Sequence, residues 1–295
     1  MVEAVHDGVR VVVLDNGTLR ATIAPAIGGR VISLIHLASG REYLWRNPRL
    51  TLAPCPPGSA YDPNFYGGMD ELIPCDIPET LDGIDCPDHG ELWTLALDDA
   101  LDGDALVLSG RLPLFGLDYR RRVRLEGNRM TCDYRIVNGT GAERKFLWKL
   151  HAALAVHPGD RILCPAGTAR AADPEWSRRT SAVPFRWPDA GGLDMSVVPA
   201  PDGTTEFLYL YDLATGTMGL QAQDGARLEC RFDLEVFPCC WYFASHGGLE
   251  GAYTAVLEPC TTMPISVNDA AREGFCSRLQ PGEALTTTVT WTASG

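Results

Sequence analysis

Short runs in which apolar and polar residues alternate recur along the whole chain, and turn residues such as Asp-Asn-Gly or Asp-Gly separate them. Alternation of period two, punctuated by such turns, predicts antiparallel strands joined by hairpins. Amphipathic helical periodicity is nearly absent, and only residues 268–273 suggest a short helical turn. The pattern therefore predicts an all-β protein, either sandwich or barrel. The expected strands are 9–14, 18–24, 30–36, 42–45, 105–110, 119–125, 130–137, 145–156, 206–211, 218–222, 227–232, 240–245, 253–258 and 284–292.

One irregular stretch, residues 54–87, interrupts this pattern. It is rich in Pro, Gly and Asp but too apolar for a disordered linker. A long ordered loop in a compact β protein is usually functional. No composition break or internal repeat marks a boundary elsewhere, so we expect a single domain over residues 1–295.

The net charge of the chain limits the classes of partner that we expect it to bind. The 295 residues carry a formal net charge of -13, with a sequence pI near 4.9. The one basic cluster, Arg120-Arg121-Arg122 with Arg124, lies in an alternating strand pattern and is interpreted as a solvated face. Nucleic acid and anionic membranes are therefore not expected, whereas neutral or cationic partners are favoured. Without a signal-like N-terminus or a span-length apolar run, we expect a cytoplasmic protein.

The ten cysteines form no CxxC pair. Cys239 and Cys240 are adjacent on an expected strand, so their side chains point to opposite faces. We interpret most cysteines as reduced core residues and expect no zinc site built from them. The pairs Gly28-Gly29 and Gly67-Gly68 lack the strand-to-helix context of a phosphate loop and are interpreted as tight turns.

Glu258 is the first candidate for chemistry. It is the last side chain of an apolar run before Pro259, and proline favours extended geometry in the residue that precedes it. Because proline also lacks an amide hydrogen, we expect strand pairing to stop here. A carboxylate at a rigid strand end suits a catalytic base, and it equally suits a solvated acid.

The run 145–156 provides a second candidate, His151. Its apolar side chains Phe146, Trp148 and Leu150 share one face, so Lys149 and His151 share the other. Such a polar row fits either a ligand-binding sheet surface or a solvated strand.

A third candidate is His89, in Asp88-His89-Gly90-Glu91-Leu92-Trp93. Alternation in an extended segment would place His89, Glu91 and Trp93 on one face. His246, before two glycines, is interpreted as a surface loop residue. A single histidine on a strand is more often a packed or exposed residue than a catalytic one. A tryptophan in such a strand is more often a core residue than a surface on which a sugar ring stacks.

Four segments together resemble the aldose 1-epimerase family, whose members are also called galactose mutarotase-like proteins. The resemblance runs from about residue 10 to the end of the chain. It implies a large antiparallel β-sandwich with few short helices and a sugar bound on a concave sheet. The exposed edges of a sandwich could pair, so the chain is expected as a monomer or homodimer, and nothing in the sequence selects between them. The segments are Gly67-Gly68-Met69-Asp70-Glu71-Leu72-Ile73-Pro74, His89-Gly90-Glu91-Leu92-Trp93, Lys149-Leu150-His151 and the run from Tyr253 to Pro264, within which Leu257-Glu258-Pro259-Cys260-Thr261 is the specific part.

The resemblance implies an isomerase that interconverts the α and β anomers of a free or modified aldose without cofactor or metal. Glu258 would take the proton of the C1 hydroxyl, His151 would protonate the ring oxygen, and His89 would bind the substrate. Other substrate-binding candidates are Glu91, Trp93, Lys149, Arg30 and Asp233. Asp233 and Asp212 are alternatives for the sugar-binding aspartate, and Arg30, Lys149 and Arg231 could recognise a phosphate.

Two other functions stay open at this point. One is a carbohydrate-binding β-sandwich that does not catalyse. The other is a metal-dependent isomerase or hydrolase in which His89, His151 and Glu258 are a two-histidine, one-carboxylate ligand set.

Overall fold

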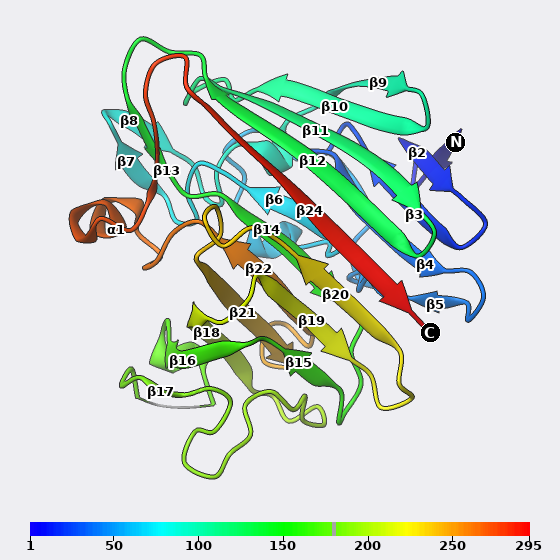
Figure 1. Cartoon of the computed structure of the whole chain (residues 1–295), viewed down its shortest axis with the longest axis vertical. Helices are drawn as coiled ribbons and strands as arrows, with labels where there is room; N and C mark the ends of the chain where they lie inside the picture. The colour runs from blue at the N-terminus through cyan, green and yellow to red at the C-terminus, as the bar shows by residue number, and fades with distance from the viewer. Residues whose placement is uncertain (179–180) are drawn as a thin grey trace.

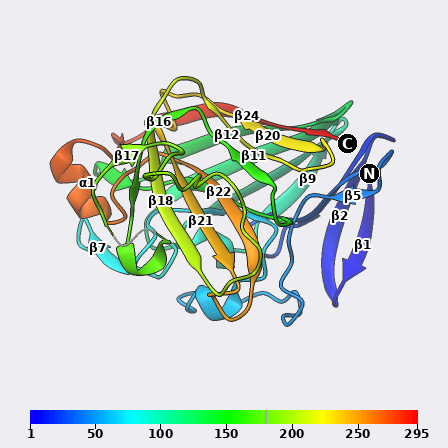
Figure 2. The same cartoon turned by 90° about the horizontal axis from the view of Figure 1, so that it is seen from below.

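Two large antiparallel sheets lie face to face in the computed structural model, which describes residues 1–178 and 181–295 (Figures 1 and 2). The predicted all-β sandwich with few short helices is therefore confirmed. Among the described helices, none has the length and apolar character that a membrane crossing requires.

The larger sheet has twelve strands and contains the segments singled out above. Along the sheet the strands follow the order β1-β2-β3-β4-β6-β14-β22-β21-β18-β16-β17, and β5 pairs with β4. Their bounds are β1 (Val2–His6), β2 (Val9–Asp15), β3 (Leu19–Ala24), β4 (Arg30–His36), β5 (Arg41–Glu42), β6 (Met69–Leu72), β14 (Lys149–Leu154), β16 (Ala166–Ala171), β17 (Phe185–Arg186), β18 (Thr205–Leu213), β21 (Cys239–His246) and β22 (Tyr253–Cys260).

The second sheet has eight strands in the order β15-β19-β20-β24-β12-β11-β10-β9. Its strands are β9 (Asp98–Asp102), β10 (Ala105–Arg111), β11 (Leu117–Glu126), β12 (Arg129–Asn138), β15 (Arg161–Leu163), β19 (Thr217–Gln221), β20 (Arg227–Arg231) and β24 (Ala284–Ser294). The remaining elements are the hairpin β7 (Glu79–Leu81) and β8 (Ile84–Cys86), the pair β13 (Arg144–Phe146) and β23 (Ser277–Leu279), the helix α1 (Val267–Glu273), and 3₁₀ turns at Asp62–Asn64, Leu92–Thr94 and Pro174–Trp176.

Most of the expected strands are present, but the one expected over residues 42–45 is wrong in its bounds, because β5 ends at Glu42 and Leu44 forms only an isolated bridge to Leu154. Two further departures lie near the candidate residues. The run 145–156 is divided into β13 and β14, which belong to different sheets. The expectation that strand pairing stops at Glu258 is wrong, because β22 continues to Cys260 and Pro259 lies opposite Cys240 of β21. Proline removes one donor, but Glu258 and Cys260 on either side keep the register with the neighbouring strand.

The expectation that all the arginines of β11 lie on a solvated face is wrong for Arg121. This side chain points between the sheets, is 3% exposed, and pairs with Glu71 of β6 at 2.6 Å. Glu71 also accepts hydrogen bonds from Tyr119, Tyr134 and the Trp148 indole at 2.9, 3.0 and 3.1 Å. Burial of a charged arginine is tolerated because a carboxylate with four donors compensates it.

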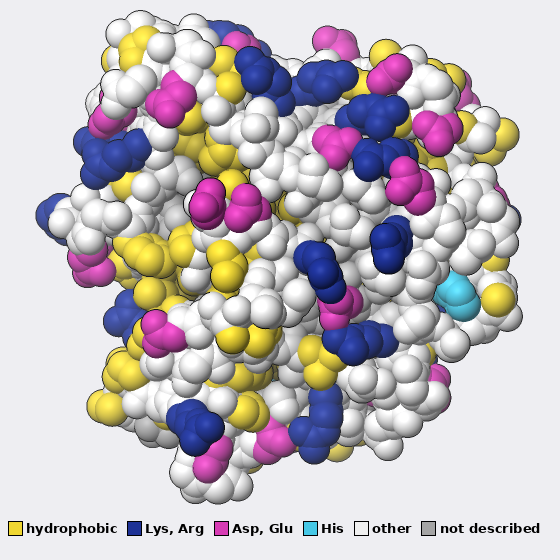
Figure 3. Space-filling view, in the orientation of Figure 1, with side chains coloured by type: hydrophobic (Ala, Val, Ile, Leu, Met, Phe, Trp, Pro, Cys, Tyr) yellow, Lys and Arg dark blue, Asp and Glu magenta, His cyan; other side chains and the backbone are white. Residues whose placement is uncertain are grey.

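The outward face of the eight-stranded sheet carries the solvated charges. Arg side chains lie there among Asp and Glu side chains (Figure 3). Arg122 pairs with Asp102 at 3.0 Å, and Arg111 pairs with Asp118 at 2.8 Å. This sheet therefore faces solvent on one side and the core on the other.

The loop 54–87 is more regular than predicted, because it contains β6 and the β7–β8 hairpin. Gly67 and Gly68 directly precede β6 and have φ of 88° and 78°, which confirms the tight turn. A Cβ on Gly67 would lie 2.3 Å from the Trp45 carbonyl oxygen, and one on Gly68 would lie 2.6 Å from that of Val31. Only glycine allows the loop to approach the sheet this closely.

The interpretation of His246 as a surface residue is wrong. It ends β21 with its side chain fully buried, and its Nδ1 lies 3.1 Å from the Thr204 hydroxyl. Burial lowers its pKa to about 4, so it is neutral near pH 7. All ten cysteines have free thiols, as expected.

Candidate active site

A cavity of about 490 Å³ opens on the face of the twelve-stranded sheet that points away from the eight-stranded sheet. That face is defined by alternation, since Glu71 points between the sheets and its neighbour Asp70 points to the other side. The cavity brings together Glu258, His151, His89 and Lys149, four of the residues predicted from the sequence. Its lining is Tyr61, Asp62, Phe65, Asp76, Ile77, Asp88, His89, Lys149, His151, Ala172, Asp173, Pro174, Trp176, Phe207, Tyr209, Phe243, Leu249, Glu258 and Ile265.

Strand register places Asp70, His151 and Glu258 in one row across the sheet. His151 of β14 lies opposite Asp70 of β6. On the other side, β14 pairs with β22 at Lys149↔Cys260 and Ala152↔Leu257, which puts His151 across from Glu258. Side chains that are directly opposite share a face and lie about 5 Å apart at Cβ. A carboxylate and an imidazole from distant segments are therefore neighbours on one surface.

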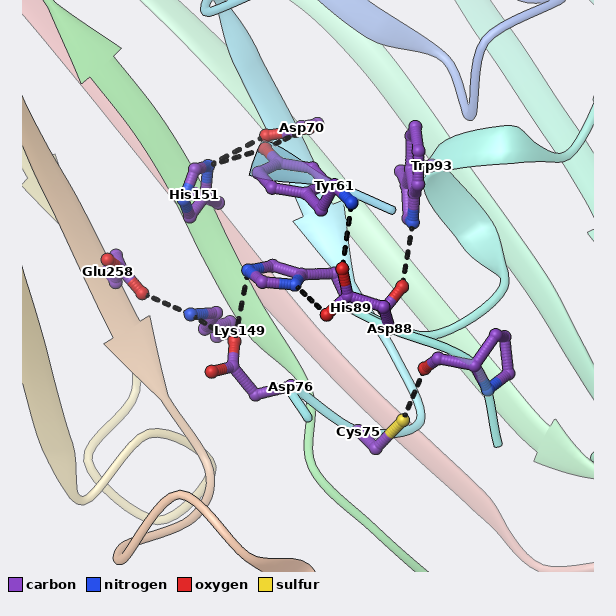
Figure 4. Close-up of polar contacts among 11 residues, drawn as sticks. Tyr61, Asp70, Cys75, Asp76, Asp88, His89, Trp93, Lys149, His151 and Glu258 are labelled. Carbon is purple, nitrogen blue, oxygen red and sulfur yellow. Dashed lines mark hydrogen bonds and ion pairs between the residues drawn. The ribbon is translucent and has the colours of Figure 1, made fainter. Parts of the chain in front are cut away.

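Asp70 fixes the orientation of His151. The Nδ1 atom of His151 donates to the Asp70 carboxylate at 2.9 Å, and the Tyr61 hydroxyl donates to the same carboxylate at 2.7 Å (Figure 4). Burial alone would raise the pKa of Asp70, but the Arg30 guanidinium at 2.6 Å and His151 outweigh it and hold the pKa below its ordinary value. With Nδ1 bound to a carboxylate, the other ring nitrogen of His151 is left to exchange a proton with a ligand.

We expect Asp70→Asn to lower the turnover rate about 10- to 100-fold. His151 would lose its fixed orientation, and with it part of the rate enhancement that a positioned general acid contributes. The amide no longer selects the Nδ1–H tautomer of His151. Steady-state rates of anomer exchange measure the effect.

Glu91→Gln is the matched control for that substitution. Glu91 is a buried carboxylate, but it accepts from the backbone amides of Leu114 and Phe115 at 2.7 and 3.0 Å, outside the cavity lining. The control should affect stability and leave the rate of anomer exchange unchanged. Equal losses of rate for the two variants would contradict the role given to Asp70.

Lys149 holds Glu258 in place. Its ammonium lies 2.6 Å from a Glu258 oxygen and 2.6 Å from an Asp76 oxygen, and 4.5 Å from the centroid of the Trp241 ring (Figure 4). Burial would lower the pKa of Lys149, but Asp76 and Glu258 raise it above its ordinary value. Lys149 therefore stays charged and compensates the buried carboxylates of Glu258 and Asp76.

His89 reaches the cavity from a turn. Its φ is 57°, its Nδ1 lies 2.8 Å from Asp88, and its ring stacks on Tyr61 with centroids 4.1 Å apart. Burial opposes protonation, but the Asp76 and Asp88 carboxylates together raise the pKa of His89. The other ring nitrogen, Nε2, lies 3.8 Å from an Asp76 oxygen, so both ring nitrogens of His89 face carboxylates at the cavity wall.

The expectation that His89, Glu91 and Trp93 share a face is wrong. The segment is a turn followed by a 3₁₀ turn at Leu92–Thr94, and not an extended strand. Trp93 packs edge-on against Tyr61 with centroids 5.1 Å apart and donates to the Asp88 carbonyl. Trp93 thus supports Tyr61 of the cavity wall from behind, and both Glu91 and Trp93 are absent from the described lining.

The other predicted binding residues also lie outside the described lining. Arg30 is 2% exposed and pairs with Asp70 behind the wall. Asp233 is exposed in a turn, where it accepts from the Glu235 amide, and Asp212 accepts from the Thr168 hydroxyl. Arg231 is 73% exposed on the other sheet, so Arg30, Lys149 and Arg231 do not converge.

Three functional side chains were missed by the sequence reasoning, namely Tyr61, Asp70 and Asp76. All three come from the loop 54–87, which was marked as functional without assigning residues. Asp70 stands inside the Gly-Gly-Met-Asp-Glu segment that carries the family resemblance, so that motif contained the signal. Nothing in the local sequence distinguishes Tyr61 or Asp76, because their partners His151 and Lys149 are distant in the chain.

The metal-ligand arrangement considered for His89, His151 and Glu258 does not occur in the part of the chain that the structure describes, where no group of three or more His, Cys, Asp or Glu side chains could hold a metal ion. Instead, each of the three has a protein partner: Asp88, Asp70 and Lys149. The arrangement suits proton transfer to and from a ligand between Glu258 and His151.

The fold is that of a galactose mutarotase-like β-sandwich, and its cavity brings Glu258 and His151 together. No protein-family model matches the chain, and no curated protein matches it. Several solved structures are similar to the chain in fold. They include a protein from Escherichia coli K12 provisionally described as an aldose 1-epimerase, with 16% identity over 96% of this chain and 98% of that one and a TM-score of 0.75.

Two galactose mutarotase-like proteins are also similar in structure. The one from Clostridium acetobutylicum has 15% identity over 100% of this chain and 98% of that one, with a TM-score of 0.75. The one from Lactobacillus casei has 15% identity over 96% of this chain and 100% of that one, with a TM-score of 0.70. The resemblance found in the sequence is thus confirmed at the level of the fold.

Proposed function

We propose that this chain, as a single domain over residues 1–295, is a mutarotase that interconverts the anomers of an aldose by opening and reclosing its ring. The observation that carries the proposal is the juxtaposition of Glu258 and His151 on neighbouring strands inside one cavity. Each has a partner that fixes its orientation, Lys149 for the carboxylate and Asp70 for the imidazole.

The proposed reaction uses no group beyond these side chains. Glu258 accepts the proton of the C1 hydroxyl while His151 donates a proton to the ring oxygen, which breaks the C1–O5 bond and leaves an aldehyde. After rotation about the C1–C2 bond, Glu258 returns its proton to the carbonyl oxygen and His151 recovers its proton from the O5 hydroxyl. His89 binds the sugar and steadies its hydroxyl groups. Neither residue is changed after one cycle.

The test is direct. The wild-type protein is added to a freshly dissolved pure anomer of glucose, galactose, xylose or arabinose, and the approach to equilibrium is followed by NMR. The proposal predicts a rate above that of buffer for at least one aldose. Sugar binding by calorimetry without acceleration would instead indicate a carbohydrate-binding protein.

We further expect the enzyme to prefer unphosphorylated sugars. Five carboxylates line the cavity, and the one cation in the described lining, Lys149, already pairs with two of them. A phosphate group in the cavity would therefore be repelled by these carboxylates. Placing like charges next to each other costs several kcal/mol of binding free energy. Each ~1.4 kcal/mol corresponds to a tenfold change in affinity. We predict that kcat/KM for glucose 6-phosphate is at least about 10-fold below that for glucose, with a gap that narrows as salt rises. A faster reaction with the phosphate would contradict this assignment.

A further inference from the structure

The cavity is longer than its acid/base pair requires. His151 lies on β14, and the lining continues over β22 and β21 to Phe207 and Tyr209 on β18. From β14 to β18 there are three strand spacings, about 14 Å in all. That length exceeds one pyranose ring, so a monosaccharide held at His151 and Glu258 leaves the far part of the cavity unfilled.

The two ends of the cavity differ in chemistry. The end at β14 and β22 presents the ionisable groups of Lys149, His151 and Glu258 beside the Tyr61 and Phe65 rings that pack on His151, whereas aromatic rings dominate the far end. Phe207 and Phe243 are paired directly across β18 and β21, with ring centroids 6.3 Å apart. Trp176, from the 3₁₀ turn at Pro174–Trp176, extends this wall, since its ring lies 6.2 Å from that of Phe243.

The aromatic wall, defined as Trp176, Phe207 and Phe243, is open to a ligand. Trp176 is 38% exposed, unusual for a side chain of its size, and all three residues line the cavity. Aromatic faces offer a flat apolar surface, which suits the C–H face of a sugar ring. A polar catalytic end with an apolar extension is typical of a small-molecule site with two contact regions.

We propose that the aromatic wall is a second subsite, which binds the next sugar ring of a reducing oligosaccharide. This inference rests on the proposed function, because the reducing end must lie between Glu258 and His151 for its C1 hydroxyl to react. The second ring is therefore the one attached on the non-reducing side. Its neutral charge fits a cavity whose sole lining cation in the described structure is already paired.

The experiment compares glucose with maltose and cellobiose, which have the same reducing unit. Anomer exchange is measured by NMR with wild type, Trp176→Ala and Trp176→Phe, and binding is measured by calorimetry. We expect a disaccharide to have a KM and Kd about 10-fold below those of glucose. Trp176→Ala should remove this advantage and leave the values for glucose unchanged, while Trp176→Phe, which keeps a ring, should retain most of it.

The failures of the two proposals can be told apart. If glucose is turned over but neither disaccharide binds more tightly, or if Trp176→Ala weakens glucose equally, the subsite is refuted and the mutarotase assignment stands. If no sugar is turned over but a disaccharide binds more tightly in a Trp176-dependent manner, the subsite stands and the catalytic assignment fails.

Discussion

Glu258→Gln is expected to lower kcat for anomer exchange by about 10²- to 10⁴-fold, the usual contribution of a positioned general base. Glutamine has the size of glutamate but accepts no proton from the C1 hydroxyl. KM should change little, because the sugar is bound chiefly by other groups. The measurement is anomer exchange of the best aldose by NMR, with sugar binding followed by calorimetry.

Glu206→Gln is the control for that variant. Glu206 is also fully buried and also pairs with a cation, Arg178 at 2.8 Å, but it points away from the cavity side of β18. It should retain the wild-type kcat even if its thermal stability falls. Turnover by Glu258→Gln at the wild-type rate would show that the base is another group.

Arg121→Met is expected to lower the free energy of unfolding by about 3–5 kcal/mol, the usual cost of removing one partner from a buried ion pair. The substitution leaves the Glu71 carboxylate between the sheets with neutral donors only. Denaturant unfolding followed by fluorescence gives the difference in midpoint and slope.

Arg122→Met is the control that distinguishes the effect of losing a buried ion pair from the effect of losing a positive charge. Arg122 is the next residue on the same strand, but its side chain is 25% exposed and pairs with Asp102 on the solvent face. An exposed pair of this kind contributes about 0–1 kcal/mol. Equal losses for the two variants would contradict the special role of the buried pair.

The strands themselves were largely predictable. Residues 30–36 were expected as a strand and form β4 over the same range, and most hairpin strands differ by one or two residues. Period-two alternation is a local property of the chain, and turn residues mark its ends. The same alternation correctly put Lys149 and His151 on one face and Trp148 on the other.

The predictions from the sequence were wrong where a neighbouring strand or a turn determines the surroundings of a side chain. Arg121 was expected in solvent, but β6 places Glu71 opposite it between the sheets. His89, Glu91 and Trp93 were expected to alternate, but the left-handed turn at His89 changes the direction of the chain. Neither the partner strand nor the sign of φ follows from the residues of the segment alone.

By itself, the sequence determined the all-β class, the polar row of Lys149 and His151, and the candidacy of Glu258. Only the tertiary structure decided that Asp70 orients His151, that Lys149 binds Glu258, and that an aromatic wall extends the cavity. The physical reason is that alternation and turns act between near neighbours in the chain. Strand order and register join residues such as Asp70, His151 and Glu258 across long separations, and no local pattern encodes that pairing.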